Sequence, residues 1–259
     1  MYQGRLAELS ISNASLETRL DINQRFSSRN FHDWLLTRLA VKPGSNVLDV
    51  GSGNGAQSLA MLARVGPLGT VSAMDISAQS IARLRDAAGN TAALQTAVGD
   101  MQDLAKAIRS EFHQKSFDLA QSTYALYYAA RPLEVLDVMR GSLSQGGRLA
   151  VCTPNDPHSL SLLCGQFLTL PPDVVSCGRF GPDVLEPYFR RHFAIVDIHL
   201  LHNVMEFRSS EDVLILMRNA AYFDPAIEAQ VRAVVESEIS SAGLFRAEKN
   251  SYLIIGHTD

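Results

Sequence analysis

Residues 47–57, VLDVGSGNGAQ, constrain the fold of this chain more than any other stretch. The apolar residues around Asp49 indicate a buried strand, and glycines at positions 51, 53 and 55 follow it directly. A glycine-rich turn between a strand and a helix lets the backbone approach a ligand closely. Turns of this kind often hold phosphate, which a neighbouring carboxylate would repel. The stretch therefore predicts a strand–turn–helix unit whose ligand is compatible with Asp49.

Strand-like and helix-like segments alternate after this turn. Ser77 can cap a helix that ends at Gly89, and Pro132 suits the first turn of another, which Gly146-Gly147 would end. Seven strands are expected, at 46–50, 70–74, 94–98, 117–121, 148–152, 193–201 and 251–257. This alternation predicts an α/β fold with a doubly wound, mostly parallel sheet that is covered by helices on both faces.

Four consecutive parts are expected along the chain. Residues 1–40 carry apolar residues at helical spacing and predict an N-terminal helical cap. Residues 41–155 contain the regular alternation and form the ligand-binding α/β core. Residues 156–192 are rich in proline and glycine, which predicts a lid or substrate insertion. Residues 193–259 contribute the last two strands of the same sheet, with helices between them.

Composition narrows the range of partners. Hydrophobic residues make up 46% and charged residues 19% of the chain, as in a packed globular protein. The formal net charge of −4 argues against nucleic acid or an anionic membrane as the partner. No stretch approaches the roughly 18 apolar residues that span a bilayer. Three cysteines without CxxC spacing and seven histidines without a metal pattern predict reduced thiols, no metal site and a cytoplasmic location.

Two ligands compete for the glycine turn. GSGNGA at 51–56 satisfies the G-x-G-x-x-G/A pattern of dinucleotide loops, and Asp75 lies where a ribose-binding acid is expected. The same residues satisfy acidic-x-G-x-G-x-G, the form of a loop for S-adenosylmethionine (SAM). A dinucleotide brings a pyrophosphate to the helix N-terminus, where Asp49 would oppose it. SAM carries an ammonium and a sulfonium with only one carboxylate, so Asp49 favours SAM.

With these motifs, the sequence resembles the class I SAM-dependent methyltransferases over most of residues 40–155. The resemblance implies a cofactor loop formed by Asp49, Gly51, Ser52, Gly53 and Gly55. VGPLGTVSAMDIS at 65–77 is similar to the family's segment that enters the second strand. There the resemblance implies that Asp75 binds both ribose hydroxyls and that Ile76 lies against the adenine.

Three later segments extend the resemblance. In VGDMQDL at 98–104, Asp100 would accept a hydrogen bond from the adenine amino group, and Met101 would pack on the ring. In FDLAQSTYALYY at 117–128, Ser122 would lie near the methionine portion. LSQGGRLAVCTPN at 143–155 resembles the family's Gly-Gly turn into the fifth strand. A member of this family is expected to use SAM and to release S-adenosylhomocysteine (SAH).

The acceptor side has weaker signals. Ligands of open α/β sheets bind beyond the carboxyl ends of the strands, which makes His158 the candidate general base, with Asp156 next. The alternative is a solvated loop histidine. Tyr124, Tyr127 and Tyr128 follow the fourth strand and are candidates for the acceptor pocket, although their helical spacing places some of them in the core. The residues QSTY at 121–124 lack the Asp/Asn-Pro-Pro-aromatic motif of the amino-methylating nucleic-acid enzymes in this family.

We therefore expect methyl transfer to a metabolite or natural product by in-line displacement, promoted by positioning and desolvation. The alternatives are a SAM-binding subunit without turnover, other SAM chemistry on the same fold, and an NAD-dependent oxidoreductase. The expected partner is a small-molecule acceptor, with no nucleic acid and no membrane insertion, and a homodimer is allowed. The residues do not define the acceptor, nor whether O, N, C or S is methylated.

Overall fold

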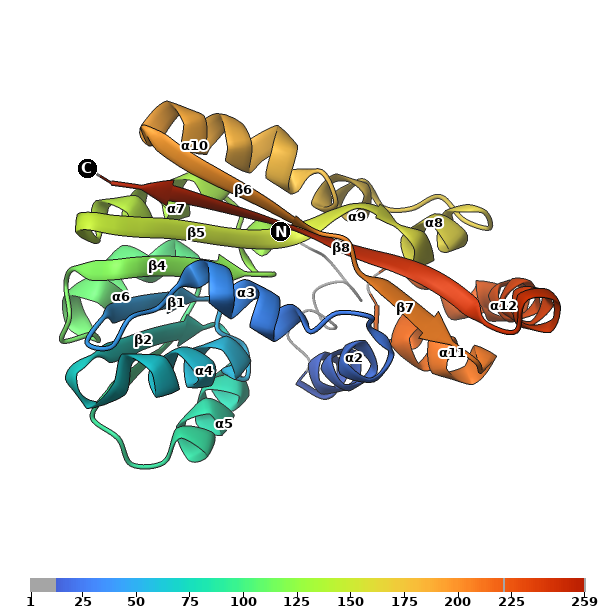
Figure 1. Ribbon diagram of the computed structural model, residues 1–259, viewed down its shortest axis with the longest axis horizontal. Coiled ribbons are helices and arrows are strands. Elements are labelled where there is room, and N and C mark those ends of the chain that lie inside the picture. The colour runs from blue at the N-terminus through green and yellow to red at the C-terminus, as the bar shows by residue number, and fades with distance from the viewer. Residues whose placement is uncertain (1–12, 221, 259) are drawn as a thin grey trace.

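A sheet of eight strands organises residues 13–220 and 222–258, which are the residues that the computed structural model describes (Figure 1). The strands lie in the order β3-β2-β1-β4-β5-β8-β6, and β7 pairs with β8 beside this series. Strands β1 to β5 run parallel, and β8 is antiparallel to β5, β6 and β7. The bounds are β1 (Asn46–Val50), β2 (Thr70–Asp75), β3 (Leu94–Val98), β4 (Phe117–Thr123), β5 (Leu143–His158), β6 (Ile195–Leu201), β7 (Val204–Phe207) and β8 (Phe245–His257).

The predicted α/β fold is confirmed, with eight strands in the described residues where seven were expected. The additional strand is β7, which follows β6 after only two residues. It has four residues, too few to show an alternating pattern of its own. Its partner is the first part of β8, from Phe245 to Glu248, so the strand depends on a tertiary pairing that no local signal reveals.

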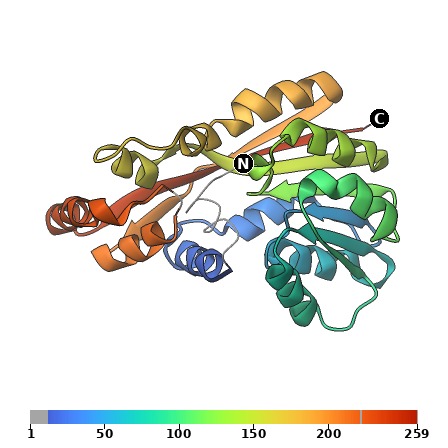
Figure 2. The same ribbon diagram turned by 180° about the vertical axis from the view of Figure 1, so that it is seen from behind.

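Helices cover both faces of this sheet. α3 and α4 pack on one face, seen in front in Figure 1, and α6, α7 and α10 pack on the other, seen in Figure 2. The helices are α2 (Asn13–Phe26), α3 (Phe31–Leu39), α4 (Ala56–Val65), α5 (Ala78–Ala88), α6 (Leu104–Ser110), α7 (Pro132–Gly141), α8 (Ser159–Gly165), α9 (Pro172–Cys177), α10 (Glu186–His192), α11 (Ser210–Arg218) and α12 (Glu228–Ala242). The predicted cap of α5 is confirmed, because Ser77 Oγ accepts from the Ser80 N–H at 3.2 Å.

Alternation along the strands explains the two cores. Val47 and Leu119 pack with α3 and α4, whereas Leu48 and Ala120 pack with α6 and α7 on the opposite face. Both faces of the central strands are therefore apolar, as in a buried parallel sheet. Asp49 lies on the same side as Val47, so its carboxylate points toward α4 and away from solvent.

One predicted helix end is wrong. The helix that begins at Pro132 ends at Gly141, not at Gly146-Gly147. Leu143 already pairs with β4, and the pairing then shifts register before it resumes. Gly146 has φ 70°, and a Cβ on Gly147 would come within 2.9 Å of backbone oxygens. The two glycines therefore form a bulge inside β5 rather than a helix stop.

The two longest strands extend beyond the rest of the sheet. β5 continues to His158 and β8 starts at Phe245, whereas strands of five and seven residues were expected. They pair with each other as far as His158 opposite Lys249. The segment expected to form a lid, 156–192, thus begins inside a strand and continues through α8, α9 and α10. The division of the chain into parts stays a prediction.

The extended strands carry a second apolar core. It is formed by α2, α8, α11, α12, β7 and the start of β8, which we call the outer lobe (Figure 1, right). Phe207 is fully buried there, with its ring centroid 4.7 Å from that of Phe26 on α2. The outer lobe is thus a packed unit with its own core, joined to the sheet through β5 and β8.

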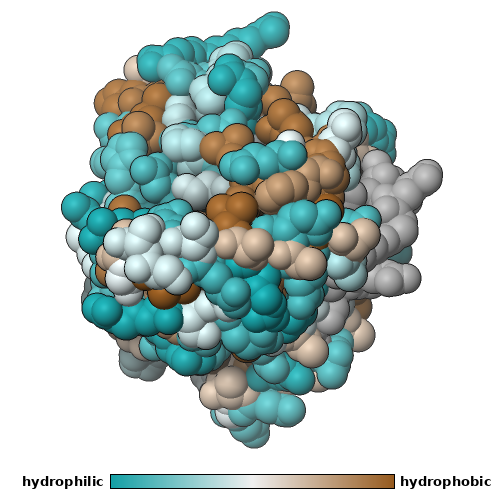
Figure 3. Space-filling view, turned by 90° about the vertical axis from the view of Figure 1, so that its right-hand side faces the viewer, coloured by the Kyte–Doolittle hydropathy of each residue, from teal (hydrophilic) through white to brown (hydrophobic). Residues whose placement is uncertain are grey.

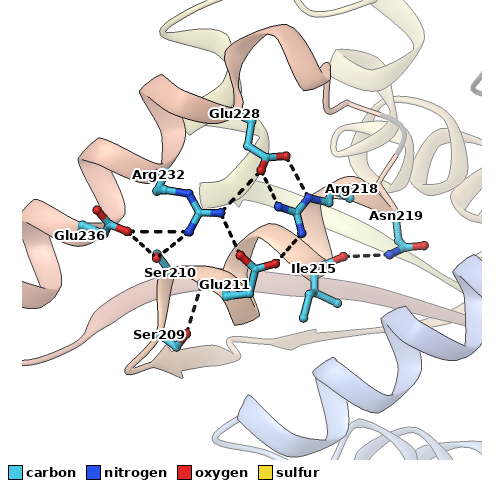
Figure 4. Close-up of polar contacts among 9 residues, drawn as sticks. All are labelled: Ser209, Ser210, Glu211, Ile215, Arg218, Asn219, Glu228, Arg232 and Glu236. Atoms are coloured by element: carbon cyan, nitrogen blue, oxygen red, sulfur yellow. Dashed lines mark hydrogen bonds and ion pairs between the residues drawn. The ribbon is translucent and has the colours of Figure 1, made fainter.

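A network of ion pairs joins α11 to α12 on the surface of the outer lobe (Figure 4). Arg218 contacts both Glu211 and Glu228, and Arg232 Nη2 lies 2.8 Å from Glu211 Oε2. The side chains are roughly one-third to one-half exposed, so water screens each pair and its contribution to stability is small. The network links the surfaces of the two helices and adds little to the stability of the fold.

The end of the molecule that carries α12 has a mixed surface (Figure 3). Apolar residues gather in its upper part, at the level where Figure 1 shows α8, and most of the remainder is hydrophilic. Leu162 on α8 is 58% exposed. Over the two described ranges, none of the helices has both the length and the apolar character needed to cross a bilayer.

Candidate functional site

The glycine turn lies at the carboxyl edge of the sheet, between β1 and α4. The N–H groups of Gly51 and Ser52 both donate to the Met74 carbonyl on β2, at 2.8 and 3.0 Å. A Cβ on Gly51 would stand 2.2 Å from Ala125 Cβ, beyond the end of β4. The backbone therefore passes through a gap that only glycine fits, held between the ends of β2 and β4.

Asp49 lies beneath this turn and is 1% exposed. Ser58 Oγ on α4 donates to Asp49 Oδ2, and Gln121 Nε2 on β4 donates to Asp49 Oδ1. Burial raises the pKa of Asp49 to about 7, while the two hydrogen bonds oppose the rise and Asp75 adds to it. The carboxylate is thus held by neutral donors, with no cationic partner among the described residues.

Neither Ser58 nor Gln121 was expected from the sequence to contribute to the site. Gln121 is 1% exposed, and its Oε1 accepts from Thr123 Oγ1 at 2.6 Å, which orients the amide toward Asp49. A buried Gln in an apolar strand was the available signal, because such a side chain needs partners. Ser58 gave no signal of its own, since serine is common near helix starts.

Asp75 ends β2, next to the turn. Its Oδ2 accepts from the Gly53 N–H and its Oδ1 from the Ser77 N–H, both at 2.8 Å. Burial raises the pKa of Asp75, and the two backbone hydrogen bonds oppose that rise. Unlike Asp49, this carboxylate is only half-buried, so each oxygen keeps a lone pair for a ligand. Ile76 beside it is 57% exposed.

The remaining cofactor candidates lie at the neighbouring strand ends. Asp100 is exposed after β3, and its Oδ1 accepts from the Gln102 N–H at 2.9 Å. Met101 Cε would lie 3.7 Å from a Cβ on Gly51, so this side chain reaches the glycine turn. Ser122 on β4 is buried, and its hydroxyl has no hydrogen-bond partner among the described residues.

These residues fit an adenosyl ligand. Ser52 within the glycine turn and Ser122 on β4 are buried hydroxyls without a partner in the described part of the chain. An exposed apolar side chain, Ile76, lies between two strand-end acids, Asp75 and Asp100. Buried polar atoms normally find partners, and large exposed aliphatic side chains beside acids are typical of a pocket wall. The roles implied for these residues stay predictions.

Beyond β4, a cavity of about 230 Å³ opens beside the candidate tyrosines. Tyr127 and Tyr128 line it together with Phe180 and Cys177. The two tyrosine rings lie 4.4 Å apart, and Tyr127 meets Phe180 edge to face at 6.3 Å. Burial raises the pKa of both tyrosines, so they stay neutral donors at physiological pH.

Tyr124 lies apart from that pair. Its φ of 54° turns the chain after β4, and its hydroxyl lies 2.7 Å from Ser251 Oγ on β8. One side of the ring meets Phe31 on α3 at 5.4 Å, and Lys249 Nζ lies 5.9 Å from the ring centroid. Tyr124 therefore stands between the sheet and the outer lobe rather than in the cavity itself.

His158 ends β5 and caps α8. Its Nδ1 accepts from the Ser161 N–H at 3.4 Å, and its ring meets Tyr222 edge to face at 5.3 Å. Burial lowers the pKa of His158 to about 4, with a further contribution from the charge of Lys249. The ring is neutral at physiological pH, and this hydrogen bond leaves the proton on Nε2. A role as general base would require His158 to release Ser161, and it stays a prediction.

Two cationic side chains at this end escaped the sequence analysis. Lys249 pairs with His158 across β5 and β8, and Arg19 comes from α2. The Arg19 guanidinium hydrogen-bonds the Tyr128 hydroxyl, and its charge also acts on Tyr222. Arg19 and Lys249 lie 230 residues apart in the chain, so no motif could have joined them.

The match to a protein family decides the class. A family model described as a methyltransferase domain matches residues 41–171, slightly more than half of the chain. The chain belongs to the class I SAM-dependent methyltransferase family. The family expected from the loop motifs is thereby confirmed.

Other comparisons agree with this family. The chain is 30% identical over 142 residues to the ubiquinone/menaquinone biosynthesis C-methyltransferase UbiE of Bordetella parapertussis. The match covers 53% of this chain and about half the length (53%) of that curated relative. The YcgJ protein of Bacillus subtilis shares the fold with a TM-score of 0.59 at 14% identity, over 88% of this chain and 97% of that one.

A third comparison includes bound molecules. Phosphoethanolamine N-methyltransferase 2 of Haemonchus contortus, in complex with phosphomonomethylethanolamine and SAH, matches with a TM-score of 0.57 at 15% identity. The match covers 96% of this chain and 58% of that one. At this identity the likeness concerns the fold. In this methyltransferase the glycine turn and Asp75 lie inside the matched residues 41–171, whereas Arg19 and Lys249 lie outside them.

Proposed function

We propose that this methyltransferase transfers the methyl group of SAM to a small-molecule acceptor bound beside the strand ends of β4 and β5. The observation that carries the proposal is the pair of acids at the glycine turn. Asp49 lies buried beneath it, and Asp75 is open beside it. A pyrophosphate on this turn would face both carboxylates. A phosphate-free, cationic nucleoside would not be repelled by them.

The residues fall into roles along the cofactor. Asp75 would accept from the ribose hydroxyls, with Ile76 and Met101 on the two sides of the adenine and Asp100 at its amino group. Ser122 and Ser52 would face the methionine portion. Asp49 is enclosed by Ser58 and Gln121, so its negative charge would act on that portion through the turn rather than by direct contact.

The protein's contribution to the reaction would be positioning and exclusion of water. When bound, SAM supplies an electrophilic methyl group. Tyr127 and Tyr128 would hold the acceptor in the cavity beyond β4, and the outer lobe would close that side from solvent. Orientation of this kind is worth up to about 7–11 kcal/mol of a reaction barrier. His158 would orient the acceptor through Nε2, or take its proton after giving up Ser161.

The acceptor class is supported by several observations. The curated relative is a C-methyltransferase of quinone biosynthesis by name, hence an enzyme with a small-molecule substrate. The cavity of about 230 Å³ is at the small end for a ligand pocket and suits a metabolite better than a polymer. The formal net charge of −4 disfavours nucleic acid.

Two measurements test the proposal. Calorimetry on the purified chain should show binding of SAM and SAH and none of NAD. The chain is then incubated with SAM and a fractionated metabolite extract, and SAH formation is followed together with a product heavier by one methylene group. Asp103→Ala, an exposed acid without a capping hydrogen bond, is the matched control for Asp75→Ala.

The outcomes separate the alternatives. NAD binding without SAM binding contradicts the proposal outright. SAM binding with no SAH formed across all fractions indicates a SAM-binding subunit. Turnover of SAM without the methylene gain in any product indicates another reaction on this fold.

A further inference from the structure

Lys249 occupies an unusual place for a lysine. It lies near the start of β8, and because β8 is antiparallel, this point meets the carboxyl edge of the parallel strands. Its backbone N–H donates to Asn203, so the strand is fixed there. Its ammonium lies over the Tyr124 ring and on the same side as His158. The side chain thus projects into the region where the acceptor is proposed to bind.

Arg19 approaches the same region from α2. Its Nε donates to the Ser15 carbonyl one turn earlier, which holds the side chain along the helix. Its guanidinium reaches the Tyr128 hydroxyl, one of the residues that line the cavity. The charge of Arg19 also acts on Lys249. Lys249 over Tyr124 and Arg19 at Tyr128 therefore place two cations around the tyrosines that follow β4. The cavity beside them is lined by Asp173 and by neither cation.

Neither cation has a carboxylate partner in the part of the chain that the structure describes. The ion pairs found there involve other residues. Arg218 and Arg232 differ from them in this respect, because each contacts at least two glutamates. Burial lowers the pKa of Lys249 to about 7, and the charge of Arg19 adds to this. Cations that are removed from water and lack a carboxylate partner among the described residues are costly, and a ligand anion would relieve that cost.

We propose that the acceptor of this methyltransferase is a small anion, a carboxylate or a phosphate monoester, whose charged group is bound by Lys249 and Arg19. This inference rests on the proposed function, since it names the substrate class of the same site. The Tyr128 hydroxyl, which accepts from Tyr127 and Arg19, would donate a further hydrogen bond to the anion, and the ring faces of Tyr127 and Tyr128 would hold its carbon skeleton.

The carboxylate of SAM is the competing occupant. Residues that bind a cofactor common to the family are expected inside the segment that the family shares, whereas acceptor-binding residues vary between members. Arg19 and Lys249 both lie outside the matched residues 41–171. They also sit on α2 and β8 and not on the strands that carry the glycine turn; of these two elements, α2 reaches the turn through Leu16. The position therefore favours the acceptor.

Proton uptake gives the inference a specific signature. Within residues 13–220 and 222–258, the charged or titratable groups found to act on or contact Lys249 are Arg19 from α2, Tyr124 after β4 and His158 on β5. Tyrosine and His158 stay neutral between pH 6 and 9, because burial raises the pKa of Tyr124 and lowers that of His158. Lys249 is the group that titrates there. An anion bound to its charged form raises its pKa, so binding above pH 7 must take up a proton.

The experiment uses the full chain saturated with SAH. Phenyl phosphate, benzoate and neutral benzamide are titrated by calorimetry at pH 6 and pH 8.5, each in two buffers of different ionisation enthalpy. At least one anion should bind about tenfold or more tightly than benzamide, with proton uptake at pH 8.5 only. Which anion binds more tightly distinguishes a phosphate from a carboxylate acceptor.

Variants make the assignment residue-specific. Lys249→Met should weaken anion binding about tenfold or more at pH 6 and abolish proton uptake, whereas Lys249→Arg should bind at both pH values without uptake. Lys106→Met, an exposed lysine on α6, should behave as wild type. Equal binding of benzoate, phenyl phosphate and benzamide would overturn the inference, as would unchanged anion binding in Lys249→Met.

Two further outcomes distinguish failure of the anion-binding inference from failure of the proposed function. If Lys249→Met weakens SAM and SAH as much as the anion probes, Lys249 binds the cofactor carboxylate, and the inference is wrong while the proposed function stands. If wild-type chain binds neither SAM nor SAH, the proposed function fails, and the anion titration is repeated without SAH on its own terms.

Discussion

The glycine turn and the outer lobe of this methyltransferase are built in opposite ways. The turn is held by contacts within the α/β core, from the Gly53 N–H donating to Asp75, 22 residues away, to Gln121 donating to Asp49, 72 residues away. The region proposed for the acceptor combines α2, the end of β5 and the start of β8, from nearly the whole length of the chain. Cofactor groups can therefore be inherited as a compact motif, while acceptor groups change one element at a time.

The largest effect is expected from breaking the core of the outer lobe. Phe207→Ala removes a fully buried ring that contacts Phe26, which should lower the free energy of unfolding by about 3–5 kcal/mol. If the two regions are separate, the surviving folded protein should bind SAM with nearly unchanged affinity. Urea unfolding and calorimetry measure the two quantities. Leu162→Ala, 58% exposed in the same lobe, is the control and should cost below about 0.5 kcal/mol.

A comparable loss of SAM affinity with Phe207→Ala, measured well below its unfolding temperature, would contradict the separation. It would mean that the outer lobe helps to order the glycine turn, which α2 approaches through Leu16, 3.4 Å from the position of a Cβ on Gly53.

The second test breaks the cofactor side. Asp75→Ala removes the carboxylate that is proposed to accept from two ribose hydroxyls, and it also leaves the Gly53 and Ser77 N–H groups without their partner. We expect SAM affinity to fall by about 100-fold, that is about 3 kcal/mol. Calorimetric titration with SAM measures this. An affinity within about threefold of wild type would contradict the proposal that the nucleoside binds at Asp75.

The third test isolates the close approach at the turn. Gly51→Ala places a Cβ 2.2 Å from Ala125 Cβ and should cost about 1–3 kcal/mol of stability, with a parallel loss of SAM affinity. Gly89→Ala is matched in backbone, with φ 69° against 76°, but a Cβ there meets nothing within 4 Å. The control should lose only about 1 kcal/mol from backbone strain and bind SAM normally. Equal losses in the two variants would show that strain alone explains the glycine.

The features that the sequence predicted are those with local causes, and the features that it missed depend on long-range contacts. The turn, Asp75 and the cap of α5 were recognised because each is a local pattern with a local physical cause. The strand β7 and the bulge at Gly146 were not, because β7 depends on a long-range pairing and Gly-Gly suits a helix stop equally well. Lys249 was missed for the same reason, since nothing near it in the chain marks it as part of a site.

The smallest effect expected concerns the charge of Asp49. Burial holds its pKa at about 7 in the free protein, and a cationic ligand nearby must lower that pKa by favouring the ionised form. Binding then releases a proton, so SAM affinity should rise by up to about tenfold from pH 6 to pH 8 and level off above. Asp49→Asn should bind SAM more weakly with a flatter pH profile, and SAH, without the sulfonium charge, should show a smaller dependence.

Lys249 makes this last experiment decisive for the comparison between the two regions. Its pKa is also about 7, and its loss of charge on raising the pH would favour a cationic ligand with the same sign. If the regions are electrostatically separate, Lys249→Met keeps the wild-type profile and Asp49→Asn removes it. If Lys249→Met instead removes the pH dependence and Asp49→Asn keeps it, the dependence arises on the acceptor side. SAM binding would then be coupled to Lys249, although the two halves of the site are built from separate segments.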